Sequence, residues 1–448
     1  MEKLYQTSTT IGRLFDYFAP YLTLLTKPSG RKLFLLLLAM VAVQYATSIN
    51  HLFKWFLRMV DGTSLNAYYY LLGKTVVPLD KFAQITVGLA LSLIPDELKG
   101  LPVFLIIDDT LQPKFGVHFE CYKTMYDHAR HNGSNYLKGH CFVAMAICVP
   151  VMDGSKMKYL HVPVGFRLRN DESKLEMASA LVELAMEEFP ASAMAILLCD
   201  SWYPKGEVLK TVKKHENLEL IANIRVDTCI YDLPPKSTGK RGRPAKKGRQ
   251  LDIHADFDFI RVGDYFIAVR TALTNLFGDL PVYITVTTPD VLNHKTYRVF
   301  ISSVDPTRLE KRFSDKRSML SDTLGGQILW LLPLFLYSFR WLIEVMFYEQ
   351  KTFWSFGLYR LRSKEGIANF VNFSSMCYAC MKLLPRFDDR FSMLLDESPQ
   401  TCKFFLGEAI RSEIFLYRFM PNSENRIKSS PDFDLFAHLE DFLLRKLA

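Results

Sequence analysis

The sequence lacks a second closely spaced pair of cysteines. Among its 448 residues there are eight cysteines, and only Cys377 and Cys380 stand as close as a CxxC pair. A zinc site built from cysteines needs another such pair, so the sequence argues against this class of site. Several of the other cysteines lie in apolar runs, as buried reduced thiols do. We therefore predict a reducing compartment and a cytoplasmic protein.

Long hydrophobic runs are missing as well. The run at 33–43 covers 11 residues before Gln44, and the run at 328–339 leads directly into Arg340. A helix that crosses a bilayer needs about 20 apolar residues. Residues 1–15 also carry charged and polar side chains where a signal peptide would have its apolar segment. We expect no membrane partner, and we expect both runs to form buried helices.

Charge of either sign is not strongly in excess. The 55 basic and 47 acidic residues leave a net charge of +8, which indicates only a mild affinity for polyanions. Because 49% of the residues are hydrophobic, the chain can bury a large core, with room for two or three domains. No internal repeat is visible.

Two apolar segments end in acidic residues. "LPVFLIIDDT" (101–110) delivers Asp108 and Asp109, and "AMAILLCDSWY" (193–203) delivers Asp200. Continuous apolar runs of this length are typical of strands buried on both faces, and sheets of this kind build sites where strands end. Residues 218–310 instead show short β-branched and aromatic runs between turns, which predict an antiparallel sheet. Helical patterns dominate before about 90 and after about 315.

A polar stripe interrupts the apolar stretch 337–351. Tyr337, Arg340, Glu344 and Lys351 stand at offsets 0, 3, 7 and 14, and at 100° per residue they fall within a sector of roughly 60° on one helix. The opposite side is apolar and would pack on a core. The stripe is either a solvated face with i,i+4 ion pairs or part of a site.

Three carboxylates thus stand out, one from Asp108 or Asp109, then Asp200 and Glu344. Taken singly, each is explained by a turn at a strand end or by an exposed charge. Together they can hold two divalent metals about 4 Å apart, the arrangement that serves phosphoryl transfer. Carboxylate oxygens are the ligands that Mg²⁺ and Mn²⁺ prefer.

The stripe resembles the signature of a known family. Tyr337-x2-Arg340-x3-Glu344-x6-Lys351 matches the Tyr-Arg-Glu-Lys signature of insertion-sequence transposases of the IS-four type. Those proteins belong to the DDE superfamily and have an RNase H-like catalytic core. The "DT" that ends the first strand, the "CD" of the second and the β-rich stretch before Glu344 are similar in layout too. The resemblance spans roughly residues 100–385.

The resemblance implies an enzyme. It would be a metal-dependent DNA transposase that cleaves at the terminal inverted repeats of its element and joins the 3′-OH ends to target DNA, using two Mg²⁺ or Mn²⁺ ions. Asp109, Asp200 and Glu344 would be the catalytic metal ligands. Asp109 is preferred because the family aspartate directly precedes Thr, and alternation then puts Asp108 on the opposite strand face in a supporting role. The alternative is a catalytically inactive or domesticated DNA-binding relative, against which the intact signature counts.

The other signature residues would bind DNA. Arg340 can make a forked contact with a phosphate, Lys351 can add a point charge, and Tyr337 can donate one hydrogen bond. Trp341 and Tyr348 border the stripe, and packing against the sheet is favoured over stacking on an unpaired base.

A basic loop lies inside the β-rich stretch. Residues 236–250 carry seven basic residues and no acid, and Arg241 and Arg243 resemble the core of minor-groove AT-hook arms. We expect this loop to contact DNA phosphates. Tyr297 is the aromatic nearest to the place where relatives that make hairpin intermediates use a stacking residue, so a hairpin route stays open. His140 and the CxxC pair are expected to be structural.

We therefore predict an α/β protein with an RNase H-like core interrupted by a β-rich insertion, between helical N- and C-terminal regions. Five regions are expected: a helical DNA-binding region (1–95), the first part of the core (96–217), the insertion (218–312), the second part of the core with the catalytic helix (313–388), and a helical C-terminal region (389–448). The resemblance further implies a bacterial, nucleoid-associated protein that binds double-stranded DNA as a homodimer or higher multimer.

Overall fold

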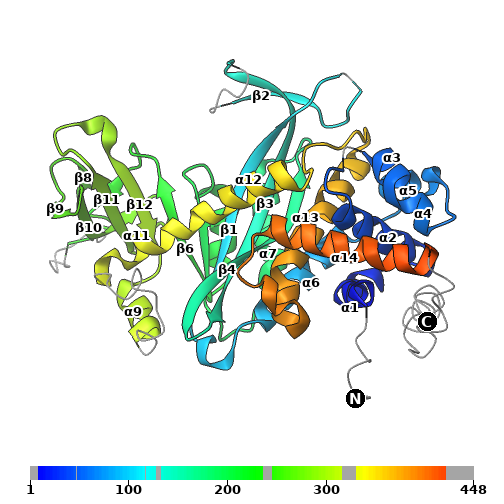
Figure 1. Cartoon of the computed structure of the whole chain (residues 1–448). Coiled ribbons are helices and arrows are strands. Elements are labelled where there is room, and N and C mark those ends of the chain that lie inside the picture. Colours follow the sequence, from blue (N-terminus) through cyan, green and yellow to red (C-terminus); the bar gives the residue numbers. More distant parts are fainter. Residues whose placement is uncertain are drawn as a thin grey trace.

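A mixed β-sheet with helices on both faces forms the centre of the molecule (Figure 1). The computed structural model describes residues 9–46, 48–116, 118–127, 133–235, 245–314 and 329–419. The sheet has twelve strands in this part of the chain. The α/β class predicted from the sequence is confirmed.

Five neighbouring strands carry the candidate site. Their order across the sheet is β4 (Lys156–Leu168), β3 (Tyr136–Asp153), β1 (Val103–Pro113), β5 (Ala195–Cys199) and β6 (Leu218–Ile224). The first three are antiparallel, whereas β5 runs parallel to β1 and β6 parallel to β5. The apolar runs of β1 and β5 are buried, as strands covered on both faces should be. Their ladder ends where Ile107 lies opposite Cys199.

The β-rich stretch continues the same sheet. Beyond β6 lie β12 (Arg298–Ser302), β11 (Val282–Thr288), β10 (Tyr265–Thr274), β7 (Ile230–Tyr231) and β8 (Gln250–Leu251), while β9 (Ile260–Val262) pairs with β10. β12, β11 and β10 are antiparallel, as predicted. β6 lies inside the range expected for the insertion, but it pairs parallel with β5. At the other edge, β2 (Lys123–Tyr126) pairs with β3 and projects from the body (Figure 1).

The described N-terminal residues are helical, as expected. The elements are α1 (Thr10–Leu22), α2 (Lys27–Ala42), α3 (Ile49–Leu52), the π-helical turn η2 (Phe53–Leu57), α4 (Arg58–Val60), α5 (Leu65–Gly73), α6 (Leu79–Ser92) and the 3-10 turn η3 (Asp96–Leu98). Helix α2 contains most of the apolar run 33–43 and is buried against α1, α5 and the C-terminal helices α13 (Lys364–Phe387) and α14 (Pro399–Phe419). Within the described ranges, no helix is long and apolar enough to cross a membrane.

A long helical segment crosses the sheet (Figure 1). It consists of α11 (Leu332–Tyr337), the 3-10 turn η7 (Ser338–Arg340) and α12 (Trp341–Phe353), and α12 packs on β1. Among the described residues, the other helical elements are α7 (Lys174–Met186), α8 (Gly206–Lys214), η4 (His294–Thr296), α9 (Pro306–Ser314), η6 (Leu329–Leu331) and η8 (Asp389–Leu394). Cys377 and Cys380 are buried in α13, so the CxxC pair is part of the core.

Candidate active site

The polar stripe of the long helix faces the end of strand β1. Nη1 of Arg340 donates to Oδ2 of Asp108 at 2.8 Å and lies 3.4 Å from Oε1 of Glu344. Nζ of Lys351 donates to the carbonyl oxygen of Leu111 at 3.0 Å. The side chain of Arg340 is only 16% exposed. The stripe is therefore an internal surface between helix and strand rather than a solvated face.

Asp108 and Asp109 point to opposite faces of the sheet. Asp108 faces the long helix, whereas the carboxylate of Asp109 meets Lys174 of α7 and Tyr203 on the other face. The sequence predicts Asp109 beside Glu344, and the structure contradicts this orientation. Alternation separates two successive side chains, but it does not determine which of them a helix more than 200 residues later will cover.

Asp200 follows the last residue of β5 and completes a group of carboxylates. Its Oδ1 accepts a hydrogen bond from the backbone N–H of Trp202 at 3.0 Å. Burial raises the pKa of Asp108, and the charges of Asp200 and Glu344 raise it further, against the lowering effect of Arg340. Burial also raises the pKa of Asp200, which the charge of Arg340 lowers. The charges of Asp200 and Glu344 therefore act on Asp108, and the guanidinium of Arg340 acts on both aspartates.

The donors suit a hard divalent cation. All three are carboxylates, the ligand type of Mg²⁺ and Mn²⁺. Burial is the largest cause of the raised pKa values of Asp108 and Asp200, and the charge of Arg340 offsets it only in part. Among the described residues, no three His, Cys, Asp or Glu side chains are gathered closely enough to enclose an ion as they stand. Arg340 lies between Asp108 and Glu344 instead.

Three aromatic residues of the long helix differ in burial. The ring of Tyr337 packs against Phe300 of β12 with centroids 5.0 Å apart, and burial raises the pKa of its phenol. Trp341 and Tyr348 are each 63% exposed. The prediction that these two rings pack against the sheet is wrong, because most of each side chain is exposed to solvent.

The structure does not present the basic loop or Tyr297 as free DNA contacts within the described residues. Arg241 and Arg243 lie outside the described residues. The later basic residues of the loop already have partners in the insertion: Lys246 pairs with Asp279, Lys247 with Asn275 and Arg249 with Asp256. Tyr297 is buried, and its hydroxyl donates to the carbonyl oxygen of Val291. Its ring is thus not presented for stacking in this structure.

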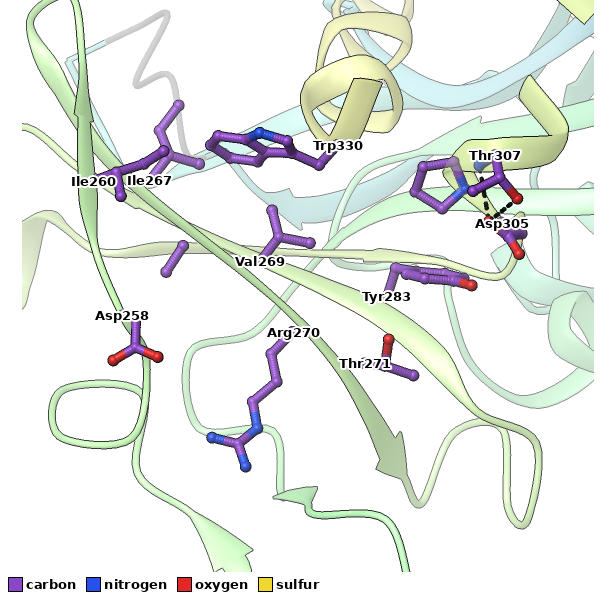
Figure 2. A pocket seen from close by; sticks show the side chains of 12 residues that line it. Asp258, Ile260, Ile267, Val269, Arg270, Thr271, Tyr283, Asp305, Thr307 and Trp330 are labelled. Carbon is purple, nitrogen blue, oxygen red and sulfur yellow. Dashed lines mark hydrogen bonds between the residues drawn. The ribbon is translucent and has the colours of Figure 1, made fainter. Parts of the chain in front are cut away.

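A groove of about 470 Å³ lies on the insertion strands, near the start of the long helix (Figure 2). Trp330 of η6 and Tyr283 of β11 line it together with Val269, and Asp258 and Asp305 lie at its rim. Tyr283 shares a sheet face with Thr271 and Ser302, its opposite residues in the ladders. Arg270 also lines the groove, but its guanidinium is paired with Asp232 at 2.9 Å, so the two carboxylates leave the groove unsuited to a phosphate. No motif in the sequence signals it.

His140 is structural, as expected. It is completely buried, with Nδ1 2.6 Å from the hydroxyl of Tyr359 and Nε2 2.9 Å from the carbonyl oxygen of Glu120. Sequence reasoning missed Lys174 and Tyr203, the partners of Asp109. A lysine at the start of a helix and a tyrosine in a loop carry no pattern that would have identified them.

Comparison with known proteins identifies the family. The model of the DDE superfamily endonucleases matches residues 20–257, just over half of the chain. The chain belongs to this family. No curated protein matches it. The matched residues include Asp108, Asp109 and Asp200 and end before Glu344. Membership of the DDE endonucleases points to a nuclease with a DNA substrate, and such domains generally use divalent metals.

Proposed function

We propose that this DDE endonuclease is a transposase of the IS-four type. It cleaves DNA at the terminal inverted repeats of its element and joins the freed 3′-OH ends to target DNA. The observation that carries the proposal is the position of Asp108, Asp200 and Glu344, which come from three distant segments. The charges of Asp200 and Glu344 both act on Asp108, and Arg340 contacts Asp108 and Glu344. The strand order from β4 to β6 supports an RNase H-like core, with β7 to β12 as its insertion.

Asp108, Asp200 and Glu344 would hold the metal ions. Asp108 takes the place that the resemblance assigns to Asp109, because only Asp108 contacts the side that carries Glu344. When bound, two Mg²⁺ or Mn²⁺ ions would activate the attacking oxygen and stabilise the leaving oxygen. Glu344 is 39% exposed and Asp108 only 12%, so the substrate approaches from the side of Glu344.

The stripe would position the DNA strand. Arg340 lies between the carboxylates, where its planar fork suits a bidentate contact with the scissile phosphate. Tyr337 and Lys351 flank it on the same helix and add a hydroxyl and a positive charge. Positioning and charge stabilisation account for most of the catalysis in phosphoryl transfer. Arg241 and Arg243 in the basic loop and the N-terminal helices would add contacts to double-stranded DNA, with two or more copies of the chain holding the two ends.

The test uses the full chain and a DNA fragment that carries the sequences flanking its reading frame. We expect the wild-type protein to nick this fragment in Mg²⁺, and we expect imperfect inverted repeats in the flanks. Asp108→Ala, Asp200→Ala and Glu344→Ala should each reduce cleavage by more than about a hundredfold. Binding in a gel-shift assay should persist, because removing a carboxylate relieves its repulsion from phosphates.

Two results would reject the proposal. Near-normal cleavage by Asp200→Ala or Glu344→Ala would remove that residue from the metal site. A wild-type chain that binds the flanking DNA but never cuts it in Mg²⁺ or Mn²⁺ would favour the inactive DNA-binding relative.

A further inference from the structure

Asp109 is fully engaged within the protein, on the face of β1 opposite Asp108. Its Oδ2 accepts from Nζ of Lys174 at 2.7 Å, and its Oδ1 accepts from the hydroxyl of Tyr203 at 2.9 Å. The thiol of Cys141 on β3 lies 3.7 Å from Oδ2. The side chain is only 16% exposed. Three elements of the core thus meet at one carboxylate.

Tyr203 belongs to the loop that begins with Asp200. The ring is completely buried, three residues after Asp200 and before helix α8. The backbone N–H of Tyr203 donates to the carbonyl oxygen of Asp200 at 3.3 Å, and that of Trp202 donates to the Asp200 carboxylate at 3.0 Å. The position of the Asp200 carboxylate therefore depends on how this short turn is fixed.

The sheet itself does not fix that turn. The ladder between β1 and β5 ends at Ile107 and Cys199, and the ladder between β5 and β6 also ends at Cys199. Asp108 and Asp200 both lie one residue beyond the last pair. Beyond this point, the hydrogen bond from the hydroxyl of Tyr203 to the carboxylate of Asp109 links β1 to the Asp200 loop.

Lys174 supplies a rigid anchor for the same carboxylate. It is the first residue of α7, whose start is fixed by a capping box between Ser173 and Glu176. Its ammonium also lies 5.8 Å from the ring centroid of Trp202, in the Asp200 loop. Helix, strand and loop are thereby joined at Asp109.

We propose that Asp109 is a positioning residue that holds the Asp200 carboxylate in line with Asp108 through Tyr203 and Lys174. This inference rests on the proposed function. The adjacent aspartates of β1 divide two tasks: Asp108 binds the cation on one face, and Asp109 sets the geometry of its partner ligand from the other. Groups that orient metal ligands in this way typically change metal affinity or activity by 10- to 100-fold when they are lost.

Tyr203→Phe tests this with the loss of a single hydroxyl. We expect Mn²⁺ affinity, measured by isothermal titration calorimetry on the full chain, to fall by about tenfold. Cleavage in limiting Mn²⁺ should slow similarly, with the KM for DNA unchanged. Excess Mn²⁺ should restore the rate, because every ligand remains. Asp109→Asn should behave in the same direction.

Tyr297→Phe is the matched control. It also removes a buried hydroxyl, one that donates to the carbonyl oxygen of Val291 in the insertion. It should change the melting temperature about as much as Tyr203→Phe does, while Mn²⁺ affinity and the Mn²⁺ dependence of cleavage stay at the wild-type level.

The outcomes separate this inference from the proposed function. Wild-type Mn²⁺ affinity and rate in Tyr203→Phe would overturn the inference, whether or not Asp109→Asn folds. An Asp109→Asn protein that cannot be rescued, beside a normal Tyr203→Phe, would make Asp109 a ligand and also overturn it. Cleavage of DNA by Asp200→Ala and Glu344→Ala would instead overturn the proposed function. If those two variants are inactive and Tyr203→Phe behaves like wild type, the proposed function stands and only the inference about Asp109 fails.

Discussion

Nζ of Lys351 donates a hydrogen bond to the carbonyl oxygen of Leu111 across 3.0 Å, and so ties the last turn of α12 to strand β1. Burial lowers the pKa of this ammonium. Lys114, three residues further along the chain from Leu111, donates to the carbonyl oxygens of Gly357 and Tyr359, which follow the helix. Lys351 on the helix that carries Glu344 and Lys114 just after the strand that carries Asp108 thus both hold the helical segment against the strand.

Lys351→Met should therefore destabilise the protein as well as slow it. The carbonyl of Leu111 would lose this donor in a partly buried place, which costs about 1 kcal/mol of the free energy of unfolding. Cleavage should also slow, since the helix carries Glu344. Urea denaturation and Mg²⁺-dependent cleavage measure the two effects. As a control, Lys364→Met removes an ammonium that is 41% exposed and 3.8 Å from Glu172, and should cost at most about 0.5 kcal/mol. Equal stabilities of the two variants would contradict the expectation.

His140 should make stability depend on pH. Its pKa is lowered to about 4, mainly by burial and in smaller part by the charge of Lys114, while the hydrogen bond with the carbonyl oxygen of Glu120 opposes the shift. Between about pH 6.5 and pH 4, the unfolded chain binds a proton at this imidazole that the folded chain does not bind. The free energy of unfolding contributed by His140 is thus complete above pH 6.5 and lost as the pH falls, by about 2 kcal/mol at pH 5.

The measurement compares wild type with His140→Gln by urea denaturation at pH 7 and pH 5. From pH 7 to pH 5, the free energy of unfolding of the variant should fall by about 2 kcal/mol less than that of the wild type. Burial also lowers the pKa of His161, but this histidine is present in both proteins and cancels in the comparison. Identical losses in both proteins would show that His140 is protonated in the folded chain.

The polar stripe could be predicted from sequence periodicity, since residues 337–353 are helical almost throughout and their side chains therefore follow the helical repeat. The strand-end acids were predictable because apolar runs identify buried strands. The choice between Asp108 and Asp109 could not be predicted, because alternation places them on opposite faces of the strand but does not say which face Arg340 will cover. β6 has the apolar pattern of an insertion strand, and only its pairing with β5 assigns it to the core. Trp341 stands within 40° of the stripe but is largely exposed, and its angle on the helix does not reveal this exposure.

The basic loop should act through its earlier arginines. Arg249 forms two hydrogen bonds with Asp256, so its charge is already engaged. Replacing Arg241 and Arg243 by Gln should weaken DNA binding uniformly across sequences and flatten the slope of log K against log salt by about 2. Arg249→Gln is the control and should leave that slope unchanged. Fluorescence anisotropy at several salt concentrations measures it, and an unaltered slope in the double variant would make the loop a solvated linker.

Trp341 should contribute to DNA binding or cleavage and not to the stability of the fold. Because its side chain is 63% exposed, Trp341→Ala should change the free energy of unfolding by at most about 0.5 kcal/mol. Trp354, at the other end of the helix, is 3% exposed and packs edge-on against Tyr378, so Trp354→Ala should cost about 3–5 kcal/mol. A ring that stacks on an unpaired base beside Glu344 would contribute about 1–3 kcal/mol to binding or to the transition state.

Trp341→Ala should accordingly lower cleavage by about 5- to 150-fold, whereas Trp341→Phe, which keeps a stacking surface, should retain most activity. Thermal melts of both variants and cleavage rates in saturating Mg²⁺ decide the question. If Trp341→Ala melts as low as Trp354→Ala, the ring is packed in the protein after all. If it melts and cleaves like wild type, the exposed indole has no part in holding DNA, and the contacts to the strand fall to Tyr337, Arg340 and Lys351 alone.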